Sequence, residues 1–398
     1  MRLTASRASI TSSGGAAPAL DAPQQEDPTL DLNFEENKTL TDDVSGNNLI
    51  TFSRASSGTY VDSDGLIKTA VADAPRFDHD PVTGESLGLL VEESRTNYCI
   101  DSENPAGWTV TNGASKQTFT AVTAPDGSIL TQGFRLPDQS SRVYPTVSSP
   151  GTVVPVCSVY VRSVSGTATL NLFIQGAAVA SDISIPSDRW LRISGTSASK
   201  NVTAFSVRGN ASQSEDVYIW AAQLEEGSFP TSYIPTSGST VTRSPDIATI
   251  EGTNFSSWYN QSEGTVFANA KITFNEALSI SQFPAVYETG IYPNRLWSLA
   301  VNSTVNGIGI GADGFSGSFG TGLSSPQTFK VAQAISNATS TYSASKDGGS
   351  VITGSVSALD PQTIMRIGGN VGGTKRISRL TFFPTPKTDQ ELIDLTKP

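Results

Sequence analysis

The chain has 398 residues, a formal net charge of −11 at pH 7 and one histidine. Its length allows two or three domains, each with a core large enough to be stable without disulfides or structural metals. Serine and threonine make up about a quarter of the residues and charged residues only 16%, against about 25% in typical soluble domains. The acidic balance argues against nucleic-acid binding, because neutralising phosphates requires clustered lysine and arginine. No apolar run approaches the roughly 18 residues needed to cross a membrane.

The scarcity of histidine and cysteine excludes several kinds of chemistry. His79 alone cannot form a multi-histidine zinc site, and Cys99 and Cys157 alone cannot form a zinc finger. Any Ser-His-Asp triad would have to use His79, which lies in a turn-rich stretch. Each cysteine has an apolar neighbour, so we interpret both as small buried hydrophobic residues.

Residues 1–30 differ in composition from the rest of the chain. A basic start is followed by Ser, Thr and Gly rather than by an uninterrupted apolar stretch, which does not fit a signal peptide. We therefore expect the protein to stay inside the cell until assembly. With few large apolar residues, this segment cannot offset the entropy of its own ordering. It is either a flexible tail or a docking segment that becomes ordered on a partner.

From residue 30 onward, short alternating runs are separated by turn residues. Residues 30–34 alternate apolar and polar side chains, as a half-buried strand does. The turn sequence DSDG at residues 62–65 separates two short runs and indicates a hairpin. Further strands are expected at residues 153–163, 168–175, 191–196, 204–208 and 217–224. Their spacing, with almost no helical periodicity between them, favours β-sandwiches over βαβ units.

A Pro/Ser/Gly-rich linker at residues 233–239 precedes a second series of alternating runs. Expected strands are residues 264–274, 296–301, 307–310, 328–334, 339–345 and 377–383. Thr388 followed by acidic residues, with Leu and Ile at helical spacing, predicts one short capped helix at the end. The fold class is therefore all-β, with tandem antiparallel β-sandwiches. We expect residues 31–247 to hold one large module or two small ones divided near 100–150, and residues 248–398 to hold another.

Several blocks of the sequence resemble segments that recur in structural proteins of tailed bacteriophages. They are FSRASSGTYVD (52–62), APRFDHDPVTG (74–84), GLLVEESRTN (88–97), WAAQLEEG (220–227), TSYIPT (231–236) and VTR (241–243). In tail fibres and other virion appendages, such blocks bracket a jelly roll similar to carbohydrate-binding modules. The last third, ending RISRLTFF (376–383), resembles concanavalin A-like or laminin G-like jelly rolls.

The resemblance implies a non-enzymatic tail fibre or spike subunit. Residues 1–30 would anchor it to other virion proteins of the tail, or to adaptor proteins near the portal. The sandwiches would bind host surface glycans, and the subunit would form a homotrimer. Its expected location is the outside of the virion after assembly in the host cytoplasm, without nucleic-acid binding or membrane insertion. One alternative is a capsid decoration or head-fibre protein. Another is a polysaccharide depolymerase, although the stacked repeats of about 20 to 30 residues that mark a β-helix are absent.

Glycan binding by such modules uses exposed aromatic rings that stack on sugars. Trp190 and Trp220 lie in or beside expected core strands, so we interpret them as structural. The candidates in loop-like stretches are Trp108, Trp258, Tyr259 and Tyr292. Simple packing of those loops is the alternative for each of them.

Jelly rolls of the kind that the chain resembles often hold a structural calcium ion, and the resemblance implies no other cofactor. The candidate ligands are Asp62, Asp64, Asp78 and Asp80. An Asp-x-Asp-Gly sequence is equally an ordinary tight turn. Adjacent pairs such as Glu92 and Glu93 point to opposite faces of an extended chain, which does not suit glycoside hydrolysis. Arg54, Arg76 and Arg95 are expected to pair with nearby carboxylates and to brace these blocks.

Overall fold

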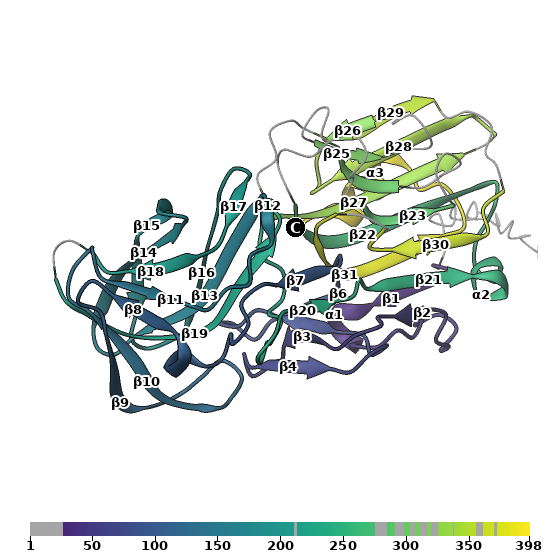
Figure 1. The fold of residues 1–398 in the computed structure, drawn as a ribbon. Coiled ribbons are helices and arrows are strands. Elements are labelled where there is room, and N and C mark those ends of the chain that lie inside the picture. The colour runs from purple at the N-terminus through teal and green to yellow at the C-terminus, as the bar shows by residue number, and fades with distance from the viewer. Residues whose placement is uncertain are drawn as a thin grey trace, which may run out of the picture.

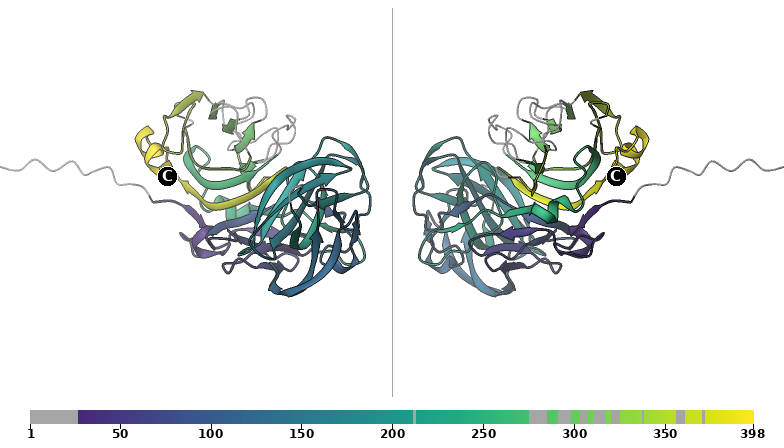
Figure 2. Two further views of the ribbon diagram at one scale, coloured as in Figure 1. Left: turned by 90° about the vertical axis from the view of Figure 1, so that its left-hand side faces the viewer. Right: turned by 90° about the vertical axis from the view of Figure 1, so that its right-hand side faces the viewer.

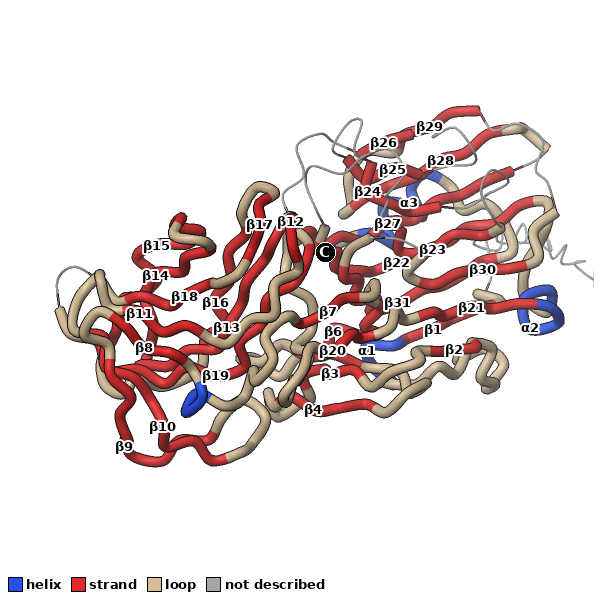
Figure 3. The backbone as a smooth tube through the Cα atoms, in the orientation of Figure 1, coloured by secondary structure: helices blue, strands red, loops and turns tan. Residues whose placement is uncertain are grey.

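The computed structural model describes residues 27–210, 213–274, 285–290, 298–302, 307–310, 317–319, 325–336, 338–355, 361–369 and 372–398. Apart from residues 27–30, the expected docking segment lies outside these ranges. Strands dominate the described chain (Figure 3). Its α-helices are short: α1 (Phe34–Asn37), α2 (Gly252–Ser256) and α3 (Asp389–Thr396). None of the described helices is long and apolar enough to cross a membrane.

The strands form two antiparallel β-sandwiches that lie side by side (Figure 1). The first, which we call the split sandwich, has an eight-stranded sheet in the described residues. Its order is β29 (Ile352–Ser355), β28 (Thr341–Lys346), β27 (Gln327–Ser336), β22 (Glu263–Thr273), β31 (Thr374–Phe383), β6 (Ser86–Val91) and β5 (Phe77–His79), and β1 (Leu30–Asn33) also pairs with β31. The facing sheet has the order β2 (Thr51–Ser53), β21 (Ile247–Glu251), β30 (Ile364–Ile367), β23 (Ala285–Thr289), β24 (Ser298–Asn302), β25 (Gly307–Ile310) and β26 (Gly317–Phe319).

The second sandwich, which we call the inserted sandwich, is built from the middle of the chain. One sheet has the order β16 (Leu191–Thr196), β13 (Pro155–Ser163), β19 (Glu215–Glu226), β10 (Ile129–Leu136) and β9 (Ser115–Thr123). The other has the order β15 (Ala177–Pro186), β14 (Thr167–Ile174), β18 (Phe205–Arg208), β11 (Arg142–Tyr144) and β8 (Thr109–Thr111). A short ribbon of β12 (Gly151–Val153) and β17 (Lys200–Val202) and a 3₁₀ turn (Pro105–Gly107) complete it.

Side-chain alternation explains how each sandwich forms its core. Along β14 every second residue from Ala168 to Ile174 is buried against the facing sheet, as the two-residue period of a strand requires. Cys99 and Cys157 lie in the same core as free thiols, which confirms their interpretation as small buried residues. At the other end of the chain, Thr388 and Glu391 form a reciprocal capping box that begins α3.

Two short strand pairs connect the sandwiches. The chain enters the inserted sandwich through β7 (Arg95–Asn97) and leaves it through β20 (Val241–Arg243), and these strands pair with each other. The hairpin of β3 (Gly58–Val61) and β4 (Ile67–Ala70) packs beside them, with Ile67 in one cluster with Trp220 and Tyr233. The inserted sandwich is therefore held at two places.

The all-β class and the tandem sandwiches are confirmed, and each expected strand and the closing helix has a counterpart within a few residues. The sheets do not, however, follow the expected division at residue 247. Leu30, Leu32 and Leu89, from early strands, lie in the same core as Leu380 and Phe382. Figure 2 shows the first strands, in purple, directly beneath the C-terminal ones. Alternation reveals which face of a strand is buried but not which strand it pairs with, so this split could not be seen in the sequence.

Candidate functional site

A buried ion network lies where the two sandwiches meet. Arg54 Nη1 donates to Asp246 Oδ1 at 3.0 Å, and Arg76 Nη1 donates to Glu92 Oε2 at 2.9 Å. Arg243 Nη1 lies 2.8 Å from the same oxygen of Glu92, and Arg76 also pairs with Asp246. All five residues are buried. A charge that loses water is tolerated only when it is paired and hydrogen-bonded, as each of these is.

Glu92 is the centre of this network. Burial by itself raises the pKa of its carboxyl, but Arg243, Arg76 and Ser232 outweigh burial and hold the pKa well below its usual range. Ser232 contributes both its backbone N–H, at 2.8 Å, and its hydroxyl, at 2.6 Å. Glu92 is therefore ionised at neutral pH and joins β6 to the segment that leaves the inserted sandwich.

The blocks that resemble phage proteins supply most of this network. Arg54, Arg76, Glu92, Ser232 and Arg243 all come from them. Arg95 pairs with Glu93 beside the network. All three arginines therefore pair with carboxylates as expected, although the partner of Arg54 is Asp246, which is distant in sequence. Because the charged side chains of the network are buried, they form a structural joint between the sandwiches.

The aromatic residues expected to stack on sugars are buried or lie outside the described residues. Trp108 is 1% exposed, stacks on Phe134 with ring centroids 6.1 Å apart, and donates from Nε1 to the carbonyl of Asp101. Trp258 and Tyr259 are 5% and 7% exposed and pack against Phe382. Tyr292 is not among the described residues. The described loops turn these rings onto the cores, because burying a large ring gains more than exposing it, so they offer no stacking face.

The aspartates proposed as calcium ligands make other contacts. Asp62 accepts from the backbone N–H of Asp64 and of Leu66, and Asp80 accepts from those of Val82 and Thr83. Asp78 pairs with Arg376 at 2.6 Å. In the described part of the chain, no three His, Cys, Asp or Glu residues are grouped as a metal site. Asp62 and Asp80 are therefore described better as turn residues than as calcium ligands.

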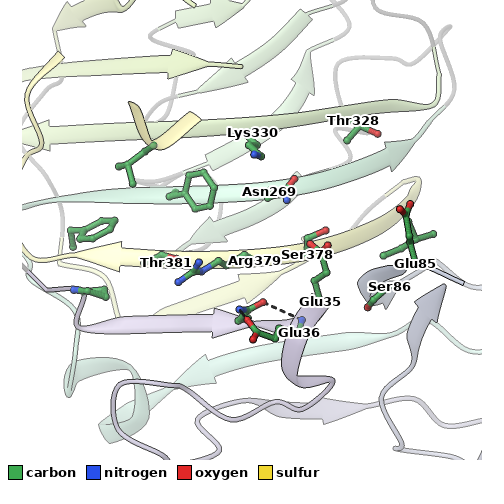
Figure 4. A pocket seen from close by; sticks show the side chains of 16 residues that line it. Glu35, Glu36, Glu85, Ser86, Asn269, Thr328, Lys330, Ser378, Arg379 and Thr381 are labelled. Atoms are coloured by element: carbon green, nitrogen blue, oxygen red, sulfur yellow. Dashed lines mark hydrogen bonds between the residues drawn. The ribbon is translucent and has the colours of Figure 1, made fainter. Parts of the chain in front are cut away.

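A groove of about 990 Å³ lies on the outer face of the eight-stranded sheet of the split sandwich. Its floor is formed by β27, β22, β31 and β1, and its sides include α1, the start of β6 and Leu395 of α3 (Figure 4). The helix α3 covers the neighbouring part of the same face, where Phe267 and Phe383 join Leu392 in a small cluster. The rings of Phe267 and Phe383 line the groove but are only 9% and 6% exposed.

Four polar side chains form a row across the floor of this groove, one from each strand. Asn269 lies directly opposite Lys330 on one side and Arg379 on the other, and Arg379 lies opposite Asn33. Directly opposite residues of an antiparallel pair share a face, and all four line the groove. Figure 4 shows Lys330, Asn269 and Arg379 on three successive strands. We call these four residues the polar row.

Hydrogen bonds hold most of the polar row in place. Arg379 Nε donates to Asp31 at 2.8 Å, and Lys330 Nζ donates to the carbonyl of Lys397 at 2.8 Å. Asn33 donates to Glu36 at 2.9 Å. The side-chain amide of Asn269 has no hydrogen bond to a described residue, and it offers both donors and an acceptor. Side chains already held in position lose less entropy when they bind a ligand.

The polar row could not be identified in the sequence, because each of its members occupies an ordinary outward position of a strand.

The spacing at residues 84–88, Gly-Glu-Ser-Leu-Gly, matches the G-x-S-x-G pattern of hydrolases. Ser86 lies in the groove, but it begins β6 instead of occupying a strand-to-helix turn. His79 is opposite it in register, yet its Nδ1 contacts the carbonyl of Val61 and makes no bond to Ser86. This arrangement lacks the geometry of a nucleophile elbow.

Comparison with family models and with curated protein sequences finds no match. Among solved structures, the chain is similar to the CBM40 domain of Ruminococcus gnavus IT-sialidase bound to alpha2,3 sialyllactose, with 15% identity over 35% of this chain and 84% of that chain and a TM-score of 0.28. It is similar to the CBM22-1 xylan-binding domain of Paenibacillus barcinonensis Xyn10C, with 12% identity over 34% of this chain and 94% of that chain and a TM-score of 0.25. It is also similar to Trypanosoma rangeli sialidase in complex with sialic acid, with 11% identity over 71% of this chain and 52% of that chain and a TM-score of 0.29. TM-scores this low support no conclusion about fold or activity.

Proposed function

We propose that this protein is a non-enzymatic virion protein of a bacteriophage, a tail fibre or spike subunit, and that the groove of the split sandwich binds host surface glycans. The polar row is the observation that carries the glycan-binding part. Neighbouring strands are about 4.8 Å apart, so four strands place the row over about 14 Å. That is the scale of a short oligosaccharide, and the row presents donors and acceptors suited to sugar hydroxyls.

The chemistry of the groove favours hydrogen bonding over stacking. The rings that line it are almost covered, whereas Lys330, Asn269 and Asn33 are partly exposed and Arg379 is exposed. Each hydrogen bond adds about 0.5–1.5 kcal/mol, so a single groove would bind weakly. Several copies on one particle would multiply weak contacts through effective concentration, which is consistent with the proposed homotrimer.

The placement on a virion rests on the sequence blocks. Their residues build the joint between the sandwiches, so the resemblance concerns how this two-sandwich unit is put together. In the proposal, residues 1–30 attach the protein to other virion proteins, and the sandwiches project outward. The capsid decoration or head-fibre role remains the competing placement.

The groove also contains carboxylates, so binding without hydrolysis needs a test of its own. Glycoside hydrolysis needs two carboxylates facing each other across the scissile bond. Three carboxylates line the groove, Glu35, Glu36 and Glu85, and Glu36 accepts a hydrogen bond from Asn33. The proposal is binding alone, so incubation with host polysaccharide should release no new reducing ends, and their release would contradict it.

Glycan binding can be tested with a glycan microarray, followed by titration calorimetry on the full chain. Asn269→Ala and Lys330→Ala should each weaken binding of the best glycan roughly two- to tenfold, because each removes one hydrogen-bonding group. Lys271→Ala is the matched control, since Lys271 lies two residues from Asn269 on β22 but does not line the groove. Equal loss in all three variants, or in none, would contradict the assignment of the groove.

The virion placement needs a separate experiment. Antibodies to the full chain, located on intact particles by immunogold electron microscopy, should place gold on the tail. Gold over the capsid would favour the decoration alternative, and absence from particles would exclude both. Light scattering should return about three times the chain mass of 41.8 kDa, whereas a stable monomer would contradict the trimer.

A further inference from the structure

A second hollow, of about 160 Å³, lies on the outer face of the sheet β15-β14-β18-β11-β8 in the inserted sandwich. It is lined by side chains of three adjacent strands, including Arg142, Tyr144, Phe173 and Arg208. Between them, Val143 and Val207 point the other way, into the core, so the alternation of the strands directs both arginines outward. A volume of this size holds about five water molecules, and therefore one sugar ring but no oligosaccharide.

Arg142 and Arg208 lie directly opposite each other in the β11–β18 register. Like charges at such positions destabilise a sheet. Neither guanidinium has an ion pair with a described carboxylate. Their side-chain hydrogen bonds go to neutral oxygens, from Arg142 to Tyr144 at 3.2 Å and from Arg208 to Ser206 at 3.3 Å. Burial, followed by the charge of Arg142, lowers the pKa of Arg208.

A ring contact orients the guanidinium of Arg208, and one donor of Arg142 lacks a hydrogen bond. Arg208 lies over the ring of Phe173, 3.5 Å from its centroid, and this cation–π contact holds the guanidinium against the sheet. Arg142 Nε is buried and has no hydrogen-bond partner in the structure. A buried polar group without a partner costs free energy.

We propose that Arg142 and Arg208 form a subsite for the carboxylate of an acidic sugar residue, with Phe173 and Tyr144 beside the sugar ring. A guanidinium presents a planar fork of donors that matches a carboxylate in two-point contact. One anion between the two arginines would offset their mutual repulsion. The site is in a different sandwich from the polar row and does not depend on glycan binding there.

The negative net charge of the chain gives acidic sugars no reason to bind outside a specific site. At −11, the protein as a whole repels polyanions, so acidic glycans have no general attraction to its surface. Binding of an acidic sugar would therefore report a local site, and it would weaken with added salt only to the extent of one or two charges.

The test is titration calorimetry of the full chain with tetrasaccharides of galacturonate, glucuronate and mannuronate, each compared with its uncharged methyl ester. At least one acid should bind saturably, and its methyl ester at least about tenfold more weakly. Arg142→Gln and Arg208→Gln should each weaken binding of the acid about tenfold or more, and Arg208→Lys should also weaken it because it keeps the charge but loses the fork. Arg189→Gln, which removes a charge from an exposed loop of the same sandwich, should leave binding unchanged.

The proposal would be overturned by no binding of any of the acids, by equal binding of acid and ester, or by undiminished binding by Arg142→Gln and Arg208→Gln together. Competition by sodium acetate as strong as by the sugars would mean that the site recognises a bare carboxylate and no sugar, which also contradicts it. Asn269→Ala in the same titrations should not change binding of the acids. These titrations thereby distinguish an absence of glycan binding in the groove from an absence of binding at the arginine subsite. Thermal melting checks that each variant is folded.

Discussion

Arg379 donates to Asp31 at 2.8 Å across 348 residues of sequence. This contact joins the first described strand of the chain to its last strand, and it fixes one member of the polar row. The same aspartate accepts from the hydroxyl of Thr381 at 2.9 Å. This one carboxylate therefore adds polar contacts to the pairing of β1 with β31 and positions a side chain that lines the groove.

Asp31→Asn should destabilise the protein, because Asp31 is 7% exposed and hydrogen bonds to a charged group contribute about 1.5–3 kcal/mol. Since the side chain of Arg379 is 45% exposed, we expect the free energy of unfolding to fall by an amount near the lower end of that range, about 1–2 kcal/mol. Urea denaturation at pH 7 measures this change. Asp394→Asn, which removes an exposed partner of Lys397, should leave the midpoint unchanged, and an equal shift in both variants would contradict the account.

Glu92→Gln should lower the free energy of unfolding more than Asp31→Asn does. It removes the charge at the centre of the buried network and leaves Arg76 and Arg243 without a full counter-charge, and breaking a buried pair costs about 3–5 kcal/mol. Glu93→Gln is the matched control, because its carboxylate is partly exposed and pairs with Arg95 outside that network. If the two variants unfolded at the same urea concentration, the network would not be what holds the sandwiches together.

The stability should also depend on pH through Glu92. Its folded pKa lies below the ordinary value of 4.5, so below about pH 4.5 the unfolded chain binds a proton that the folded chain does not. The stabilisation is thus complete above that pH and is lost as the pH falls. Melting temperatures measured from pH 7 down to pH 3 should drop below about 4.5, and the drop should be shallower in Glu92→Gln. An identical slope in that variant would assign the acid sensitivity to other groups.

The two halves of the split sandwich should not fold apart. A fragment of residues 248–398 leaves β31 without β1 and β6 and exposes the apolar side chains that Leu30, Leu32 and Leu89 cover. We expect it to be insoluble or to lack dispersed amide signals in NMR spectra. Residues 93–244, which contain the whole core of the inserted sandwich, should give a folded spectrum. A folded 248–398 fragment would restore the division expected from the sequence.

Local features of the fold could be read from the sequence, whereas long-range pairing could not. The hairpin around Asp62 and Gly65 and the cap at Thr388 depend on residues a few positions apart, and both were predicted. The pairing of β1 with β31 depends on strands at opposite ends of the chain. The alternation of residues 30–34 would be the same with any partner, so it carries no information on pairing.

The burial of Trp108 and Trp258 could not be predicted for a related reason. Both lie in loop-like stretches of the sequence, but a loop position does not determine whether the ring turns toward solvent or toward a core. Asn269 has no distinguishing neighbours in sequence and acquires its role only beside Lys330 and Arg379. The pairing of Arg142 with Arg208 likewise appears only once β11 and β18 are adjacent.

The central claim is that glycans bind along the polar row, and a crystal structure of the full chain with the strongest microarray binder tests it most directly. The account predicts sugar density across Lys330, Asn269, Arg379 and Asn33, with hydroxyls within hydrogen-bond distance of the Asn269 amide. Density elsewhere on the protein with an empty groove, or a microarray on which no glycan binds, would contradict it.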